Sequence, residues 1–119
     1  EEIKSEINTD KIYDVFIVLD CADDRLGEVR VLYEKARKKI NIDHHISNPG
    51  CGDVRIVEPK RSSTAELLYD LMDPAAVDEE IARALYIGII HATGVLRYSN
   101  TAPHTLQVVS ELIKFGFDF

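Results

Sequence analysis

The chain has 119 residues, which is enough for one small domain and too few for two. Hydrophobic residues make up 45% of it, so it can build a core, which argues against disorder. Its formal net charge of −7 argues against general binding to nucleic-acid backbones, which needs a basic surface. A small phosphorylated substrate stays compatible with this charge, because a bound divalent cation can supply the missing positive charge.

Cysteine usage and the distribution of apolar residues bear on the cellular compartment. Cys21 and Cys51 form neither a Cys-x-x-Cys pair nor a disulfide framework, and such thiols are typical of a reducing cytosol. The first residues do not resemble a signal peptide, and no apolar run approaches the ~20 residues of a membrane span. We therefore predict a cytoplasmic protein with no membrane partner.

A strand, a helix and a second strand are expected in the first third of the chain, after a polar lead-in over residues 1–12. Residues 14–20 are apolar and rich in β-branched side chains, which predicts a buried strand, and residues 39–43 predict another. Between them, apolar residues recur at helical spacing after an Asp that can cap a helix. Such a βαβ unit predicts parallel strands with a right-handed crossover.

The rest of the chain is expected to add one strand and three helices. Residues 53–58 alternate in polarity and predict a third strand. One helix is expected to begin at Ser63, whose spacing to Glu66 is that of a capping box, another near Asp78, and the last at Pro103. The predicted buried stripe of the last helix consists of Leu106, Val109, Leu112 and Ile113. The expected fold class is therefore α/β, with a Rossmann-like parallel sheet flanked by helices.

Polar residues follow the first two predicted strands. Asp20 ends one strand, and Asp43, His44 and His45 end the other. The carboxyl ends of adjacent parallel strands lie ~5 Å apart, at the edge where open α/β sheets bind ligands, so Asp20 and His44 can share a metal. Carboxylates and imidazoles are ligands for Mn, Fe, Co or Zn. Asp20 could instead cap the following helix, and the triplet alone could be an ordinary strand-end turn, but the two strand ends together favour a metal site.

Three segments, in order along the chain, resemble the motifs of the DHH phosphoesterases. Residues 43–45 resemble the signature triplet, residues 18–23 look like the second motif, and residues 85–101 look like the fourth. The Ser-Ser-Thr helix start and the Arg-Tyr-Ser-Asn-Thr segment at 97–101 are most similar to the branch of bacterial bifunctional oligoribonucleases and pAp phosphatases. The resemblance extends from about Tyr13 to the C-terminus.

The resemblance implies a metal-dependent phosphodiesterase or phosphatase with two closely spaced metals, usually Mn²⁺, with Mg²⁺ or Co²⁺ as alternatives. By the family pattern Asp20 would bridge the metals and His44 would ligate one of them. Asp43 would contact the ligating residues without contacting the metals, and His45 would face the substrate phosphate. A metal-activated hydroxide would attack phosphorus in line. The implied substrates are short oligoribonucleotides, pAp-like nucleotides and linear dinucleotides, while the pyrophosphatase and single-strand exonuclease branches stay open.

The sequence also departs from the family pattern. No His precedes Asp20, so the family's opening motif of one His and two Asp is absent from these residues, as is its C-terminal substrate-binding domain. We therefore expect residues 1–119 to be a partial DHH phosphoesterase domain. Ala92 stands where the fourth motif carries an Asp ligand, and the neighbouring His91 is expected to point elsewhere, because adjacent helical residues are ~100° apart. The missing carboxylate predicts weak metal binding and impaired or absent activity.

Ser63 and Arg97 are candidate substrate contacts, and the sequence leaves two other functions open. Ser63 could bind a phosphate through the N-terminus of its helix, although simple capping is the more ordinary role. Arg97 could contact substrate, although an Arg in an extended segment is usually a solvated charge. The alternative function is a catalytically inactive nucleotide- or metal-binding module, and the least specific one is a structural Rossmann-like domain. A homodimer formed through an exposed helix stays open.

Overall fold

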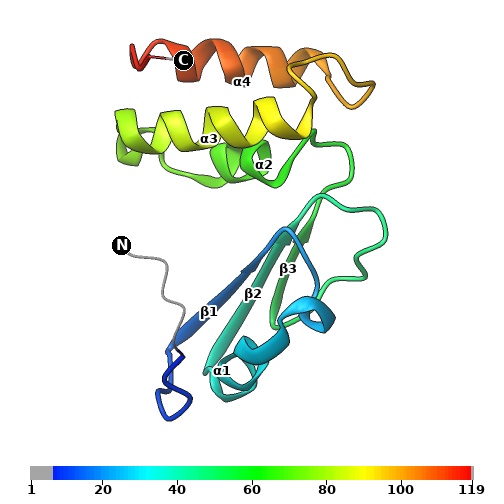
Figure 1. Ribbon diagram of the computed structural model, residues 1–119, viewed down its shortest axis with the longest axis vertical. Coiled ribbons are helices and arrows are strands. Elements are labelled where there is room, and N and C mark those ends of the chain that lie inside the picture. The colour runs from blue at the N-terminus through cyan, green and yellow to red at the C-terminus, as the bar shows by residue number, and fades with distance from the viewer. Residues whose placement is uncertain (1–6, 119) are drawn as a thin grey trace.

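A parallel three-stranded sheet forms one layer of the protein (Figure 1). The computed structural model describes residues 7–118, so part of the predicted lead-in, residues 1–6, lies outside the described residues. The strands β1 (Val15–Leu19), β2 (Lys38–Asp43) and β3 (Val54–Val57) pair in chain order. Leu19 lies opposite Ile42, so β1 and β2 end at nearly the same level. The predicted α/β class and the parallel pairing are confirmed, with strand ends displaced by one residue.

The crossover between β1 and β2 contains less α-helix than the sequence predicts. Two 3₁₀ turns precede one short helix: Asp23–Arg25, Gly27–Val29 and α1 (Arg30–Lys35). Gly27 has a φ of 54°, a left-handed conformation that separates the two turns and interrupts the predicted helix. No side chain caps any of the three elements, so the expected Asp cap is wrong. The buried ring of Tyr33 packs edge to face on Phe16, with ring centroids 5.7 Å apart, and ties α1 to the sheet.

Three longer helices form a second layer beyond the carboxyl ends of the strands (Figure 1). They are α2 (Thr64–Leu71), α3 (Glu79–Ala92) and α4 (Pro103–Ile113), with a 3₁₀ turn at Pro74–Ala76. Their shared core consists of Val77, Ala82, Leu85, Ile89, Val108, Leu112 and Phe117. A smaller cluster joins Val18 of β1 to Tyr33 of α1 and to Cys51. Among the described residues, no helix is long and apolar enough to cross a membrane.

The prediction of a buried first strand is wrong for one face of β1. Val18 is 2% exposed, but Val15, Ile17 and Leu19 on the opposite face are 49%, 51% and 44% exposed. β1 is an edge strand of this sheet, and none of the described elements covers that face. Alternate residues of a strand point to opposite faces, so a continuous apolar run does not reveal which face is covered here.

The buried stripe of α4 is also displaced from its predicted position. The predicted Leu112 is buried and Val109 packs against the core, but Leu106 and Ile113 are largely exposed, and Thr105 and Val108 are buried instead. Thr105 turns inward because its hydroxyl donates a hydrogen bond to the buried carboxylate of Glu66, at 2.9 Å. The polar Thr105 is therefore buried in the core, whereas the apolar periodicity predicted burial of its neighbour Leu106.

Candidate metal centre

Three side chains that can ligate a metal meet where β1 and β2 end. Asp20, His44 and His45 each offer one ligand atom, and these three atoms lie within 4.8 Å of one another. The Nε2 atom of His44 is 3.6 Å from Oδ1 of Asp20, and Nδ1 of His45 is 3.9 Å from the same oxygen. The backbone N–H of Asp20 donates to the carbonyl of Ile42, at 3.1 Å, which carries the β1–β2 pairing one residue beyond β1. The register of the sheet thus sets the distance between the two strand ends.

Asp20 adopts a left-handed backbone conformation with a φ of 63°. Such a conformation costs about 1–2 kcal/mol for most residues, and Asp is among those that tolerate it best. It turns the side chain toward α2, where the hydroxyl of Thr64 donates to Oδ1 of Asp20 at 2.8 Å. Non-glycine residues in this region concentrate at functional sites, because the surrounding contacts must hold them there. Asp20 does not cap the following 3₁₀ turn.

Asp43 is 1% exposed and supports both histidines. Its Oδ1 accepts from the backbone N–H groups of His44 and His45, at 2.6 and 3.1 Å, and lies 2.7 Å from Nδ1 of the His45 ring. Its Oδ2 accepts from the side-chain amide of Asn48 at 2.6 Å. Burial raises the pKa of Asp43, but the hydrogen bonds from Asn48 and His45 outweigh this and lower the pKa below its usual value. The result is an ionised carboxylate that orients the His45 ring.

Asn41 supports the backbone of the site, and the sequence prediction missed it. Its fully buried side-chain amide donates to the carbonyls of Val18 and Cys21, on either side of Asp20, at 3.2 and 2.8 Å. Its Oδ1 accepts from Asn48 and from the Cys51 N–H, at 3.1 and 3.3 Å. The available signal was an amide between two apolar strand residues, Ile40 and Ile42, because a buried amide needs partners.

A backbone carbonyl fixes the ring of His44. Its Nδ1 lies 3.2 Å from the carbonyl oxygen of Arg61. A carbonyl can only accept, so in the neutral imidazole Nδ1 carries the proton and Nε2 presents a lone pair to Asp20. Two atoms with lone pairs therefore face each other at 3.6 Å, an arrangement that a cation between them would stabilise. The donor set thus fits a divalent metal, and metal binding itself stays a prediction.

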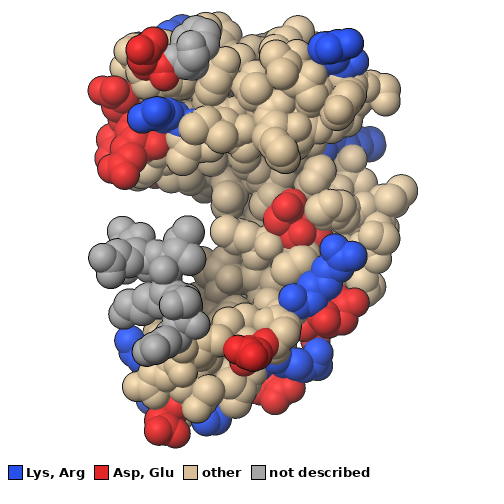
Figure 2. Space-filling model, in the orientation of Figure 1, with Lys and Arg blue, Asp and Glu red and all other residues tan. Residues whose placement is uncertain are grey.

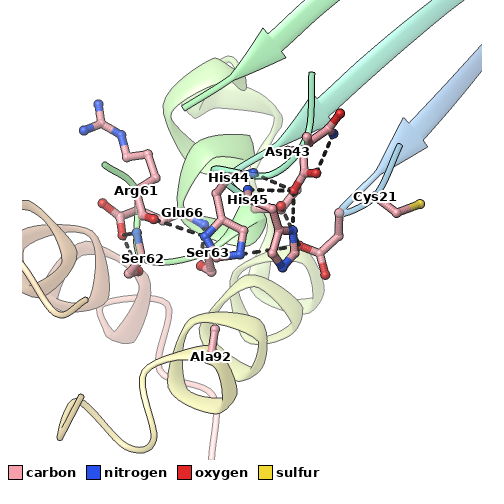
Figure 3. Close-up of polar contacts among 12 residues, drawn as sticks. Cys21, Asp43, His44, His45, Arg61, Ser62, Ser63, Glu66 and Ala92 are labelled. Carbon is pink, nitrogen blue, oxygen red and sulfur yellow. Dashed lines mark hydrogen bonds and ion pairs between the residues drawn. The ribbon is translucent and has the colours of Figure 1, made fainter. Parts of the chain in front are cut away.

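A cleft between the sheet and the helical layer opens onto these residues (Figure 2). Its lining includes Leu19, Asp20, His44, Leu68, His91 and Ala92. The methyl group of Ala92, the last residue of α3, points toward Ser63 and the two histidines (Figure 3). His91, still within α3, lines the same cleft. Its ring nitrogens nevertheless lie outside the group of close ligand atoms.

Of the candidate substrate contacts, Ser63 is the N-cap of α2. Its hydroxyl accepts from the backbone N–H of Glu66 at 3.1 Å. The reciprocal half of the predicted capping box is wrong, because the Glu66 carboxylate instead binds the N–H and hydroxyl of Ser62. Arg97 lies exposed in the turn after α3, and its guanidinium has no hydrogen-bond or ion-pair partner within residues 7–118. Roles in substrate binding stay predictions for both.

Three bacterial proteins are similar to this chain in sequence. The Thermus thermophilus bifunctional oligoribonuclease and PAP phosphatase NrnA is 42% identical over 79 residues, which cover 65% of this chain and 24% of that protein. The probable enzyme of the same name from Streptococcus mutans is 36% identical over 116 residues, covering 93% and 37%. The Bacillus subtilis enzyme is 32% identical over 107 residues, covering 85% and 34%. The chain thus spans about a third or less of the length of most of these relatives.

Solved structures share the fold of this chain, and a family model identifies its family. An exopolyphosphatase-related protein from Bacteroides fragilis superposes with a TM-score of 0.79 at 29% identity, over 88% of this chain and 33% of that one. A putative family II inorganic pyrophosphatase from Methanococcus jannaschii, at 17% identity and a TM-score of 0.69 over 88% and 38%, shares the fold. Residues 1–89 match the model of the DHH family, N-terminal domain. The chain therefore belongs to the DHH family.

Proposed function

We propose that this chain is part of a metal-dependent phosphoesterase that hydrolyses short oligoribonucleotides, pAp-like nucleotides or linear dinucleotides. The observation that carries the proposal is the convergence of Asp20, His44 and His45 within 4.8 Å at the carboxyl edge of the sheet. Relatives named as oligoribonucleases and PAP phosphatases support this substrate class. In this proposal residues 1–119 are the central part of the catalytic domain, and the complete enzyme includes residues beyond them.

The proposed cofactor is Mn²⁺, with Mg²⁺ or Co²⁺ as alternatives. A carboxylate together with an imidazole suits a transition ion better than Mg²⁺, which prefers an all-oxygen shell. Asp20 and His44 would hold the ion. When bound, such an ion would activate a water molecule for attack on phosphorus.

The protein groups around the ligands would position the phosphate. Nδ1 of His45 is engaged by Asp43 at 2.7 Å, which leaves Nε2 to face the substrate. A second cleft beside His45 is lined by four acidic side chains and one basic one, those of Asp20, Asp23, Asp24, Asp43 and Arg25. A phosphate would be repelled from this cleft unless a cation offsets the carboxylates, which is a second reason to expect a metal.

Ala92 is the residue that sets the activity of this chain. Its methyl group points toward the histidines and brings no ligand atom. We propose that the chain is impaired for this reason, since a missing carboxylate removes one negative charge and one ligand oxygen. The alternative is a nucleotide- or metal-binding module without catalytic activity, and the same side chain favours it.

The test is Mn²⁺-dependent hydrolysis of pAp and of a short oligoribonucleotide. It compares the full-length protein that contains this chain with its Ala92→Asp variant. We expect the Asp variant to be faster by about 100-fold or more, because even residues behind the ligands contribute about 10–100-fold. Asp20→Asn in the same background is the negative control. If Ala92→Asp is as inert as the parent although Mn²⁺ binds, the enzyme assignment fails and the binding module replaces it.

A further inference from the structure

One peptide group connects a buried carboxylate to the ring of His44. The carbonyl of Arg61 accepts from Nδ1 of His44 at 3.2 Å. The N–H of Ser62, on the same peptide group, donates to Oε2 of Glu66 at 2.9 Å. Figure 3 shows Glu66, Ser62 and Arg61 together on one side of the two histidines. The contacts form a continuous chain from the carboxylate, through the peptide, to the imidazole.

Burial and hydrogen bonds hold the carboxylate of Glu66 in this position. The residue is 1% exposed. Its Oε2 also accepts from the Ser62 hydroxyl and, at 2.9 Å, from the hydroxyl of Thr105 on α4. Three donors on one oxygen match the acceptor-only character of a carboxylate. The first turn of α2 further favours a negative charge, because the backbone N–H groups there point toward it.

We propose that Glu66 is a positioning residue that sets the ring orientation and the ligand strength of His44 through the Arg61–Ser62 peptide. This inference rests on the proposed metal-dependent function and adds to it a residue that does not touch the metal. Hydrogen bonds in a chain polarise one another, so the carboxylate makes the Arg61 carbonyl a stronger acceptor. A stronger acceptor at Nδ1 makes Nε2 a better ligand, as carboxylates do when they contact a metal-binding histidine directly.

Asp70 provides the matched control. It lies on α2 like Glu66 and accepts from the side chain of Arg61 at 2.7 Å and from His104 at 2.8 Å. His104 also approaches Oε1 of Glu66, at 3.9 Å. Asp70 therefore shares the helix, the charge and the neighbouring His104 with Glu66, but has no hydrogen bond to the Arg61–Ser62 peptide group within residues 7–118. Asp70→Asn removes the same kind of charge without touching the chain of contacts.

The experiment measures the His44 ring in the purified, metal-free protein by ¹⁵N NMR, at a pH where the imidazole is neutral. The parent and Asp70→Asn should show the Nδ1–H tautomer, with two well-separated ring nitrogen shifts. Glu66→Gln should move these shifts toward each other and bring the Nδ1–H proton upfield. Mn²⁺ titration should then give about tenfold weaker binding for Glu66→Gln and less than a twofold change for Asp70→Asn.

Two results would overturn the role of Glu66. One is a His44 tautomer and a Mn²⁺ affinity that Glu66→Gln leaves unchanged, and the other is an equal change in Asp70→Asn. If Glu66→Gln does not fold, the test uses the unsubstituted protein. The inference requires a hydrogen-bond scalar coupling between its His44 ring and its Arg61 carbonyl, and the absence of this coupling would refute it. Hydrolysis plays no part in this test, so a protein that hydrolyses nothing refutes the proposed function and leaves the NMR result standing.

Discussion

Replacement of Asn41 by Ala tests whether the buried amide holds the site together. The side chain makes four hydrogen bonds, two to the carbonyls of Val18 and Cys21 and two from Asn48 and the Cys51 N–H. In Asn41→Ala all four are lost within a fully buried environment. The carbonyls of Val18 and Cys21 then lose this common partner, and we expect the backbone conformation at Asp20 to become less well fixed.

The magnitude follows from these contacts. A typical hydrogen bond contributes about 0.5–1.5 kcal/mol, and a buried group left without a partner costs about 1–3 kcal/mol. Asn48 can move toward solvent, whereas the Cys51 N–H and the two carbonyls are held by the backbone. We therefore expect Asn41→Ala to lower the free energy of unfolding by about 3 kcal/mol. With a urea m-value of roughly 1.5 kcal/mol/M, the midpoint falls by roughly 2 M.

The assay is urea unfolding followed by circular dichroism at pH 7, with Mn²⁺ affinity measured on the same samples. Asn8→Ala is the control, because within residues 7–118 the side chain of the exposed Asn8 accepts a single hydrogen bond, from the Asp10 N–H. A surface change of this kind stays within about 0.5 kcal/mol. A loss below about 1 kcal/mol for Asn41→Ala, with unchanged Mn²⁺ affinity, would show that Asn41 does not hold the strand ends.

Two further predictions concern acid stability and a close backbone approach. The pKa of Asp43 is lower in the folded protein than its ordinary 3.8, so its stabilising contribution is complete above that value and is lost as the pH falls through the lowered pKa. Urea midpoints of the parent and Asp43→Asn should therefore differ at pH 7 and converge below about pH 4, and a constant difference would contradict the linkage. Gly52 has a φ of 74°, and an added Cβ would lie 2.9 Å from the backbone oxygen of Lys39, whereas Gly27 faces open space. Thermal melting should show a larger loss for Gly52→Ala than for Gly27→Ala, and equal losses would mean that left-handed strain alone accounts for both.

The order of the elements and the place of the site could be predicted from the sequence. Apolar runs followed by Asp20 and by the Asp-His-His triplet marked two strands and the polar residues that meet at their carboxyl ends. Ser63 and Asp78 marked two helix starts, where their side chains accept backbone N–H groups as expected. These features are local, because strand periodicity and capping depend on residues close together in the chain.

Contacts between distant residues were decided by the tertiary structure. The sequence cannot show that Thr105, 39 positions from Glu66, takes a core position on α4, because the hydroxyl is drawn inward by a partner on α2. Nor can it show that a carbonyl at Arg61 selects the tautomer of His44, since every residue has a carbonyl and only packing decides which one faces the ring.

The sequence by itself determined which residue types end the strands, and therefore the chemistry available at the edge of the sheet. The tertiary structure alone decided that Asp20 turns left-handed toward Thr64, and that β1 leaves one apolar face uncovered. The physical reason is that periodicity follows from the backbone of one element, whereas exposure and side-chain direction depend on which other elements pack beside it.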